Sequence, residues 1–208
     1  MRYSTILSSL ATLCVVSALP TSLFLPVGNL PSQPTTGTLI LRDLVALDGA
    51  ISTLAGSLNT LDFSTDNAGN KDATLRQVLV NTIAYQITTQ TARLNAQGIT
   101  AKLSSADSLA IVNKLTNDIT PHLKTVTDLL SRAKSSSILG FSTTLGGFLG
   151  GVLSPLGLVN YLDLIQTDTA GLITALLPFI DSTLQDQAIS EAEVINNLLS
   201  ATLDLYTN

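Results

Sequence analysis

The feature that most constrains this chain is an apolar repeat whose steps alternate between four and three residues. Its first run covers three heptads and consists of Ile40, Leu44, Leu47, Ile51, Leu54, Leu58 and Leu61. Such steps place the side chains on one face of an α-helix, which has 3.6 residues per turn. Polar residues such as Arg42 and Asp48 lie between them and form the opposite face. A helix with one apolar face packs against other helices, so the repeat predicts a helical bundle.

Two further helices are predicted after the polar turn at residues 62–72. The second helix runs from about Ala73 to Gln97, ends at Gly98, and carries the apolar residues Leu75, Leu79, Ile83, Ile87 and Leu94. The third helix begins at Ser104, whose hydroxyl can cap the first turn, with Asp107 at the favourable end of the helix dipole. Its apolar stripe keeps its phase through Pro121, so we expect one kinked helix there.

The last part of the chain predicts two more helices. The fourth runs from about Leu156 to Leu184 across Pro178, with Val159, Leu162, Ile165, Thr169, Leu172, Leu176, Ile180 and Leu184 facing inward. The fifth is expected to start at Ser190 as N-cap, with Glu193 three residues later and Ile189 packing on Val194. The predicted fold is therefore an all-α antiparallel bundle of about five amphipathic helices, two of them kinked by proline.

The amino terminus has the pattern of a secretory signal. Arg2 precedes the apolar run 6–16, and Val16-Ser17-Ala18 supplies the small residues that a signal peptidase accepts. We therefore expect a signal peptide at residues 1–18 and a secreted, extracellular or cell-wall location. Residues 19–38 are rich in Ser, Thr and Pro and predict either an O-glycosylated arm or a disordered leader. The bundle domain then covers residues 39–208.

An uncharged segment interrupts the bundle pattern. The 28 residues 135–162 carry no charge and include six glycines, all of them within the apolar part at 135–157. Three interpretations are open: an apolar loop or short helices on the bundle, a surface for lipid or interfaces, or an insertion into a membrane. The candidates for contact with a hydrophobic surface are Phe141, Leu145, Phe148, Leu149, Val152 and Leu153.

The residue types that enzymes need are scarce in this sequence. The only histidine is His122, the only cysteine is Cys14 inside the predicted signal, and no Gly-x-Ser-x-Gly string occurs. We therefore predict no enzyme activity, no metal site and no cofactor, with His122 on the rim of a helix. Nucleic acid is an unexpected partner, because the net charge is -5 and no Lys or Arg follows Lys134.

With these function classes set aside, the sequence favours binding of lipids or hydrophobic surfaces. Only 12% of the residues are charged, whereas about 25% is typical, and 45% are hydrophobic. Kinked helices in a bundle can leave an apolar cavity between them, with a few polar groups that orient a ligand. The candidate lining residues are Ile83, Ile87, Val112, Ile119, Val126, Leu172 and Leu176, with Tyr85 or Thr91 as the polar group. Each of these residues also suits an ordinary bundle core.

Residues 39–206 resemble the fungal hydrophobic surface-binding protein A family, which includes cell-wall galactomannoproteins. The resemblance rests on the signal peptide, on the segments 43–48 and 103–109 that open two helices, and on a closing helix with Tyr206. It implies a secreted helical protein that adsorbs to hydrophobic surfaces, binds fatty acids in some members, and brings lytic enzymes such as cutinases to those surfaces. Cell-wall polysaccharide is a further implied partner. The alternative is a structural wall protein or effector that binds a protein partner through its acidic last third.

Overall fold

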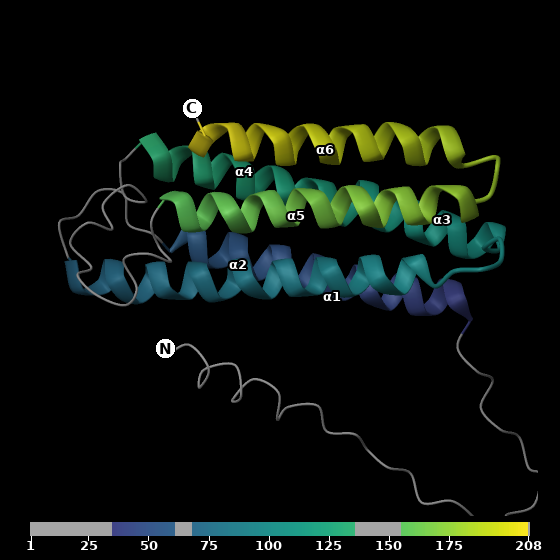
Figure 1. Cartoon of the computed structure of the whole chain (residues 1–208), viewed down its shortest axis with the longest axis horizontal. Coiled ribbons are helices and arrows are strands. Elements are labelled where there is room, and N and C mark those ends of the chain that lie inside the picture. The colour runs from purple at the N-terminus through teal and green to yellow at the C-terminus, as the bar shows by residue number, and fades with distance from the viewer. Residues whose placement is uncertain (1–34, 61–67, 136–154, 208) are drawn as a thin grey trace, which may run out of the picture. The chain divides into compact units, whose positions relative to one another are not determined.

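A computed structural model describes residues 35–60, 68–135 and 155–207, and the regular structure in these ranges is entirely helical. The elements are α1 (Thr36–Asn59), α2 (Ala68–Gln97), α3 (Ser105–Lys114), the π-helical turn η2 (Leu115–Ile119), α4 (Thr120–Ser135), α5 (Pro155–Leu176), the 3₁₀ turn η3 (Leu177–Phe179) and α6 (Gln185–Thr207). Because α3, η2 and α4 follow one another without a break, they form one long helix. Five long helices thus pack side by side in alternating directions (Figure 1), which confirms the predicted all-α bundle.

The first helix buries the predicted face. Thr35 caps α1 by accepting a hydrogen bond from the backbone N–H of Thr38 at 3.1 Å, so the helix starts inside the expected arm. The apolar repeat of α1 is almost fully buried at Ile40, Leu44, Leu47, Ile51, Leu54 and Leu58. This burial agrees with the sequence because a repeat of Leu and Ile over three heptads leaves only one apolar face to bury.

The second helix buries the predicted Leu79, and Leu75 packs partly buried against the core, but the rest of the helix buries a different face from the predicted one. It starts at Ala68, inside the expected turn, and packs against both α1 and α5. The buried stripe is Val78, Thr82, Tyr85, Thr89, Ala92 and Ala96, and it also keeps steps of four and three. Val80, Ile87 and Leu94 are instead more than half exposed. Small and hydroxylated side chains allow α2 to approach two neighbours, and the buried Thr82 and Thr89 donate to the Val78 and Tyr85 carbonyls at 2.8 and 2.9 Å.

The third predicted helix is continuous through its proline. Ser104 is the N-cap, and its hydroxyl accepts from the N–H of Asp107 at 3.0 Å, as the sequence predicts. The helix widens into the π-helical turn η2 immediately before Pro121. Proline has no N–H and its ring crowds the carbonyl four residues earlier, so a wider turn at this position relieves that conflict.

The predicted helix across Pro178 is wrong at its end. Helix α5 stops at Leu176, the 3₁₀ turn η3 contains Pro178, and Ile180 is extended. The carboxylate of Asp181 then accepts hydrogen bonds from the N–H and the hydroxyl of Thr183 at 2.9 and 2.7 Å, which reverses the chain. Pro178 therefore terminates a helix instead of kinking one, because it cannot donate the hydrogen bond that would continue it.

The predicted start of the last helix is also wrong. Helix α6 begins at Gln185, so Ser190 lies inside it, and Ile189 and Val194 are both exposed rather than packed on each other. Helix α6 packs against α4 and α5. A capping pattern in the sequence is overridden here, because the turn at Asp181 already starts the helix one turn earlier.

Candidate functional site

A cavity of about 30 Å³ lies in the core of the bundle. All five long helices contribute to its wall. The lining residues are Leu47, Ile51, Tyr85, Ile111, Leu115, Ile119, Leu123, Thr169, Leu172, Ile173, Leu176, Leu177, Ile180, Ala188, Ala192 and Ile195. Fourteen of these sixteen side chains are aliphatic, so the cavity is an apolar space inside the hydrophobic core.

Two local features leave this space unfilled. Helix α6 presents Ala188 and Ala192 to the cavity, where a larger side chain would fill it. The π-helical turn η2 also contributes Leu115 and Ile119 to the wall, and its extra residue per turn displaces the helix locally. Cores normally pack without space for more than a water molecule, and the small side chains of α6 account for the space that is left here.

Tyr85 on α2 and Thr169 on α5 are the two polar residues that line the cavity. Burial raises the pKa of the Tyr85 phenol, and the neighbouring Thr169 hydroxyl offsets part of that rise. Tyr85 is therefore a neutral hydroxyl at every physiological pH. No hydrogen bond of ordinary length and angle reaches the buried Oγ1 of Thr169.

The structure places three of the predicted cavity residues on the wall, namely Ile119, Leu172 and Leu176. Val112 and Val126 are buried elsewhere in the core. Ile83 is half-buried, and the expected inward position of Ile87 is wrong, since its side chain is 54% exposed. Ile87 is exposed because α2 buries the stripe that contains Thr82, Tyr85 and Thr89.

Of the two predicted polar groups, Tyr85 lines the cavity and Thr91 does not. Thr91 is exposed and donates to the Ile87 carbonyl at 2.8 Å. The surface candidates Phe141, Leu145, Phe148, Leu149, Val152 and Leu153 lie outside the described residues.

The wall contributed by α6 was missed by sequence reasoning. Ala188, Ala192, Ile195 and Leu199 follow the same steps of four and three as the first helix and are all buried. That periodicity predicts the buried face of α6, but an alanine in a buried stripe does not by itself predict a cavity. Whether a small side chain leaves a space depends on what the facing helices supply.

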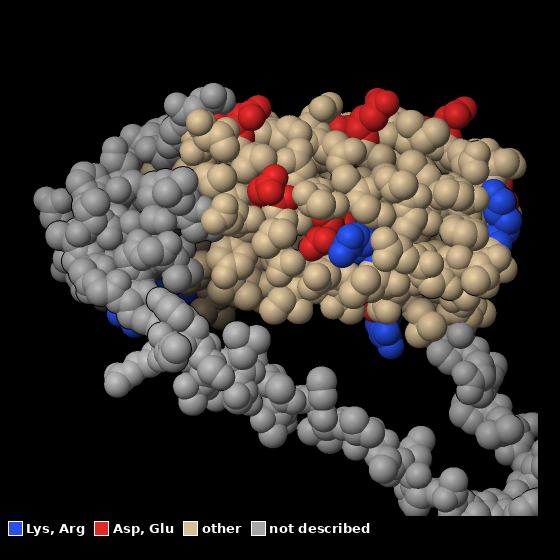
Figure 2. Space-filling view, viewed as in Figure 1, with Lys and Arg blue, Asp and Glu red and all other residues tan. Residues whose placement is uncertain are grey.

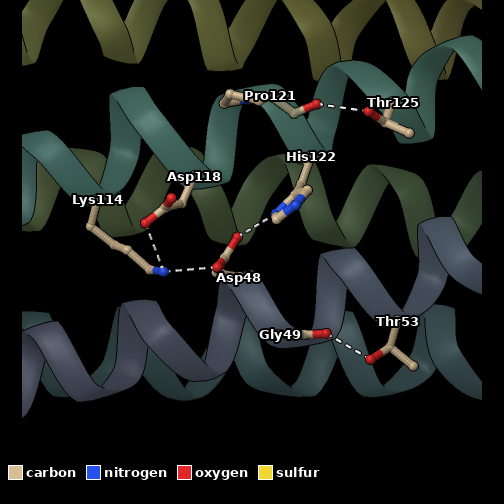
Figure 3. Close-up of polar contacts among 8 residues, drawn as sticks. All are labelled: Asp48, Gly49, Thr53, Lys114, Asp118, Pro121, His122 and Thr125. Atoms are coloured by element: carbon tan, nitrogen blue, oxygen red, sulfur yellow. Dashed lines mark hydrogen bonds and ion pairs between the residues drawn. The ribbon is translucent and has the colours of Figure 1, made fainter.

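A polar cluster joins α1 to the α3–η2–α4 helix (Figure 3). The Asp48 carboxylate on α1 accepts a hydrogen bond from Lys114 Nζ at 2.8 Å and lies 2.6 Å from Nδ1 of His122. Lys114 also pairs with Asp118 at 2.9 Å. Each member of the cluster on these two helices is next in sequence to a cavity residue, as Asp48 is to Leu47 and His122 is to Leu123.

The charges in this cluster stabilise one another. Burial raises the pKa of Asp48, but the hydrogen bonds from Lys114 and His122 outweigh this effect and leave that pKa below its usual value. Burial lowers the pKa of Lys114, but its hydrogen bonds to Asp48 and Asp118 outweigh this effect and leave that pKa above its usual value. The cluster is therefore a satisfied ionic contact that joins two helices, and its geometry gives no nucleophile or general base a free role.

Among the described residues, no group of three or more His, Cys, Asp or Glu side chains is arranged to hold a metal ion. No helix in residues 35–60, 68–135 or 155–207 is long and apolar enough to cross a membrane.

Comparisons with known proteins place the fold. No family model matches the sequence, and a search among curated proteins gives no match either. Among solved structures, AFMP4P in complex with palmitic acid is similar, with a TM-score of 0.64 and 20% identity over 82% of this chain and 99% of that one. The chain shares that fold. Ligand binding domain 1 of the Penicillium marneffei MP1 protein, complexed with arachidonic acids, is also similar, with a TM-score of 0.62 and 12% identity over 83% of this chain and 99% of that one.

The two similar structures concern the predicted fold and the predicted family. Both neighbours are helical domains captured with a fatty acid, and at these identities the likeness shows a shared fold. The resemblance to the hydrophobic surface-binding protein A family stays a prediction.

Proposed function

We propose that this protein binds a long-chain lipid of the fatty-acid class in the core cavity between its helices. The observation that carries the proposal is an apolar space inside a single bundle whose fold is shared with two proteins solved with fatty acids. Burial of an acyl chain against fourteen aliphatic side chains supplies the driving force, at about 0.8 kcal/mol for each CH₂ group removed from water.

The cavity must widen to take such a ligand. Its volume of about 30 Å³ is close to the share of one water molecule, whereas small-molecule pockets span roughly 300–1,000 Å³. Separation of α1 from the α3–η2–α4 helix would enlarge it, and the ion pairs of Asp48 with Lys114 and His122 would have to open or shift in that movement. Ligand uptake should therefore be slow and coupled to helix movement.

The test is palmitic acid binding to delipidated protein, followed by native mass spectrometry and by the rise in the unfolding temperature. The Ala192→Leu variant fills the cavity, so we expect at least a tenfold weaker affinity than the wild type. Ala201→Leu, at an exposed position on the same helix, is the matched control and should bind normally. Equal affinity in Ala192→Leu and the control, or no saturable binding by the wild type, would refute the proposal.

Adsorption to hydrophobic surfaces is a second candidate function, and one surface feature favours it. Val80, Ile87 and Leu94 repeat every seven residues on α2 and are each more than half exposed. Charged side chains are few and scattered over the bundle face seen in Figure 2. Replacing all three residues by serine should reduce retention on hydrophobic beads. Unchanged retention would exclude this stripe, and removal of residues 141–153 would then test the glycine-rich segment.

Secretion to the extracellular space or cell wall belongs to the same proposal. Its support is the signal pattern of residues 1–18. Recruitment of secreted lytic enzymes would follow only if the surface adsorption holds. The mass of protein recovered from the culture medium gives the test, because cleavage after Ala18 predicts a chain that begins at Leu19, and an intact Met1 would contradict it.

A further inference from the structure

Resting on the proposed lipid-binding function, we infer that the cavity selects lipids whose head group is uncharged, and that Tyr85 and Thr169 hold this head group. The ligand class is a long-chain alcohol or a fatty acid in its protonated form. The two hydroxyls are the polar groups among the sixteen lining residues, and they face each other from the packed helices α2 and α5.

Thr169 is the first line of support, because no hydrogen bond of ordinary length and angle reaches its hydroxyl, whose polar neighbour is the Tyr85 phenol. The residue is only 6% exposed. Other buried threonines donate to the carbonyl four residues earlier, as Thr82 and Thr202 do at 2.8 Å. A buried hydroxyl that forgoes this bond carries an unmet desolvation cost, which a hydroxyl or carboxyl group of a ligand would remove.

The charges around Thr169 determine which head group fits. Asp168, the preceding residue, is buried and pairs with Arg93 Nε at 3.1 Å, while Gln86 donates to its other oxygen at 3.1 Å. The nearby cation is thus already committed to a carboxylate. An ionised lipid head at Thr169 would be desolvated without a free positive charge and beside Asp168, which disfavours it strongly. A neutral hydroxyl or carboxylic acid avoids that penalty.

Lys102 defines the competing arrangement. Its Nζ donates to the Pro178 carbonyl at 2.5 Å, next to the lining residue Leu177, at the bundle end where the α2–α3 and α5–α6 connections meet. A fatty acid could place an ionised carboxylate there, with its chain pointing inward. Lys102 is exposed to water, however, where a single ion pair contributes little, whereas Thr169 is a buried residue of the cavity wall.

The experiment compares 1-hexadecanol and palmitic acid on the delipidated full chain by titration calorimetry between pH 5 and pH 9. Hexadecanol affinity should stay constant. Palmitic acid affinity should fall by about tenfold per pH unit above the pKa of the acid, because only the protonated form binds. The charged groups around the cavity act on both lipids through any change in the protein, so the ratio of the two affinities isolates the head group. These groups are Arg93 on α2, Asp168 on α5, Asp48 on α1, Lys114, Asp118 and His122 on the α3–η2–α4 helix, Glu191 on α6, and Lys102 and Asp181 in the connections.

Two conservative variants test the residues. Thr169→Val should weaken hexadecanol binding about five- to tenfold and change the unfolding temperature of the ligand-free protein little, because no hydrogen bond of ordinary length and angle reaches its hydroxyl. Thr82→Val, a buried position on α2 away from the cavity, is the matched control and should bind normally. Tyr85→Phe gives an independent measurement should Thr169→Val fold poorly.

The outcomes separate the two proposals. A palmitic acid affinity that is independent of pH and is lost in Lys102→Met would overturn the neutral-head inference and place an ionised head at Lys102. Normal hexadecanol binding by both Thr169→Val and Tyr85→Phe would overturn it as well. If the wild type binds neither lipid, the proposed function itself fails.

Discussion

One carboxylate oxygen of Asp48 accepts a hydrogen bond from Lys114 at 2.8 Å, and the other lies 2.6 Å from Nδ1 of His122. Lys114 and His122 stand on opposite sides of the π-helical turn η2, so a single acid on α1 contacts the long helix both before and after its widened turn (Figure 3). Leu47, Leu115 and Leu123, each adjacent in sequence to one of these residues, line the cavity behind the contact.

Replacement of Asp48 should therefore be costly. In Asp48→Asn the Lys114 ammonium loses its main partner on α1 while only 15% of its side chain is exposed, so we expect the free energy of unfolding to fall by about 2 kcal/mol. Asp118→Asn is the control, because Asp118 is 47% exposed and pairs with Lys114 within one helix, which predicts a loss below about 0.5 kcal/mol. Urea denaturation at pH 7 measures both, and similar losses in the two variants would contradict the assigned role of Asp48.

Stability should fall in acid through two aspartates. The pKa of Asp48 is lowered in the fold, and the Ser105 hydroxyl with the Thr183 N–H and hydroxyl lowers the pKa of Asp181 to about 2. Both values lie below the unfolded value of about 4, so their contribution is complete above that pH and disappears as the pH falls toward the folded values.

Urea denaturation between pH 6 and pH 2 tests this sign. The wild type should lose stability progressively below about pH 4, and Asp48→Asn and Asp181→Asn should each flatten the decline. A steeper decline in either variant would show that the carboxylate does not stabilise the fold in its ionised form.

Two glycines on α1 predict opposite effects of the same substitution. Gly37 is buried, and a Cβ at this position would overlap the side chain of Asp107 at the start of α3. Gly37→Ala should therefore destabilise the protein by about 1–3 kcal/mol. At Gly49 a Cβ would meet nothing within 4 Å, so Gly49→Ala should stabilise the helix by about 0.5–1 kcal/mol. Thermal unfolding of both variants checks this, and stabilisation by Gly37→Ala would mean that α1 and α3 are further apart than described.

Local signals account for the correct part of the sequence analysis. The Ser104 cap depends on residues within one turn of each other, and the α1 face depends on a repeat that offers one apolar stripe. The errors occur where a local signal competes with another contact. Pro178 permits either a kink or an end, and the turn held by Asp181 decides for the end. The capping pattern at Ser190 is unused because α6 has already begun.

In the candidate site, too, some residues could be predicted from local periodicity and others depended on tertiary contacts. Ile119, Leu172 and Leu176 could be predicted from the apolar periodicity of their helices, and Tyr85 could be predicted as a polar group. On α2 the apolar pattern favours Ile83 and Ile87 as lining residues, because they are more apolar than Thr82 and Thr89. The structure buries the threonines, since each bonds to its own helix backbone and each is small enough for α2 to approach two neighbours.

The sequence by itself thus determined the all-helical class, the buried face of the first helix and the apolar character of the core, because these follow from periodicity and composition. Only the tertiary structure decided which stripe α2 buries, where α5 ends and where the core stays unfilled. A cavity is the volume that neighbouring helices fail to fill, so the effect of the small Ala188 and Ala192 depends on the other side chains that line it, including Leu115 and Ile119 of the widened turn. The buried hydroxyl of Thr169 likewise exists only in the folded core.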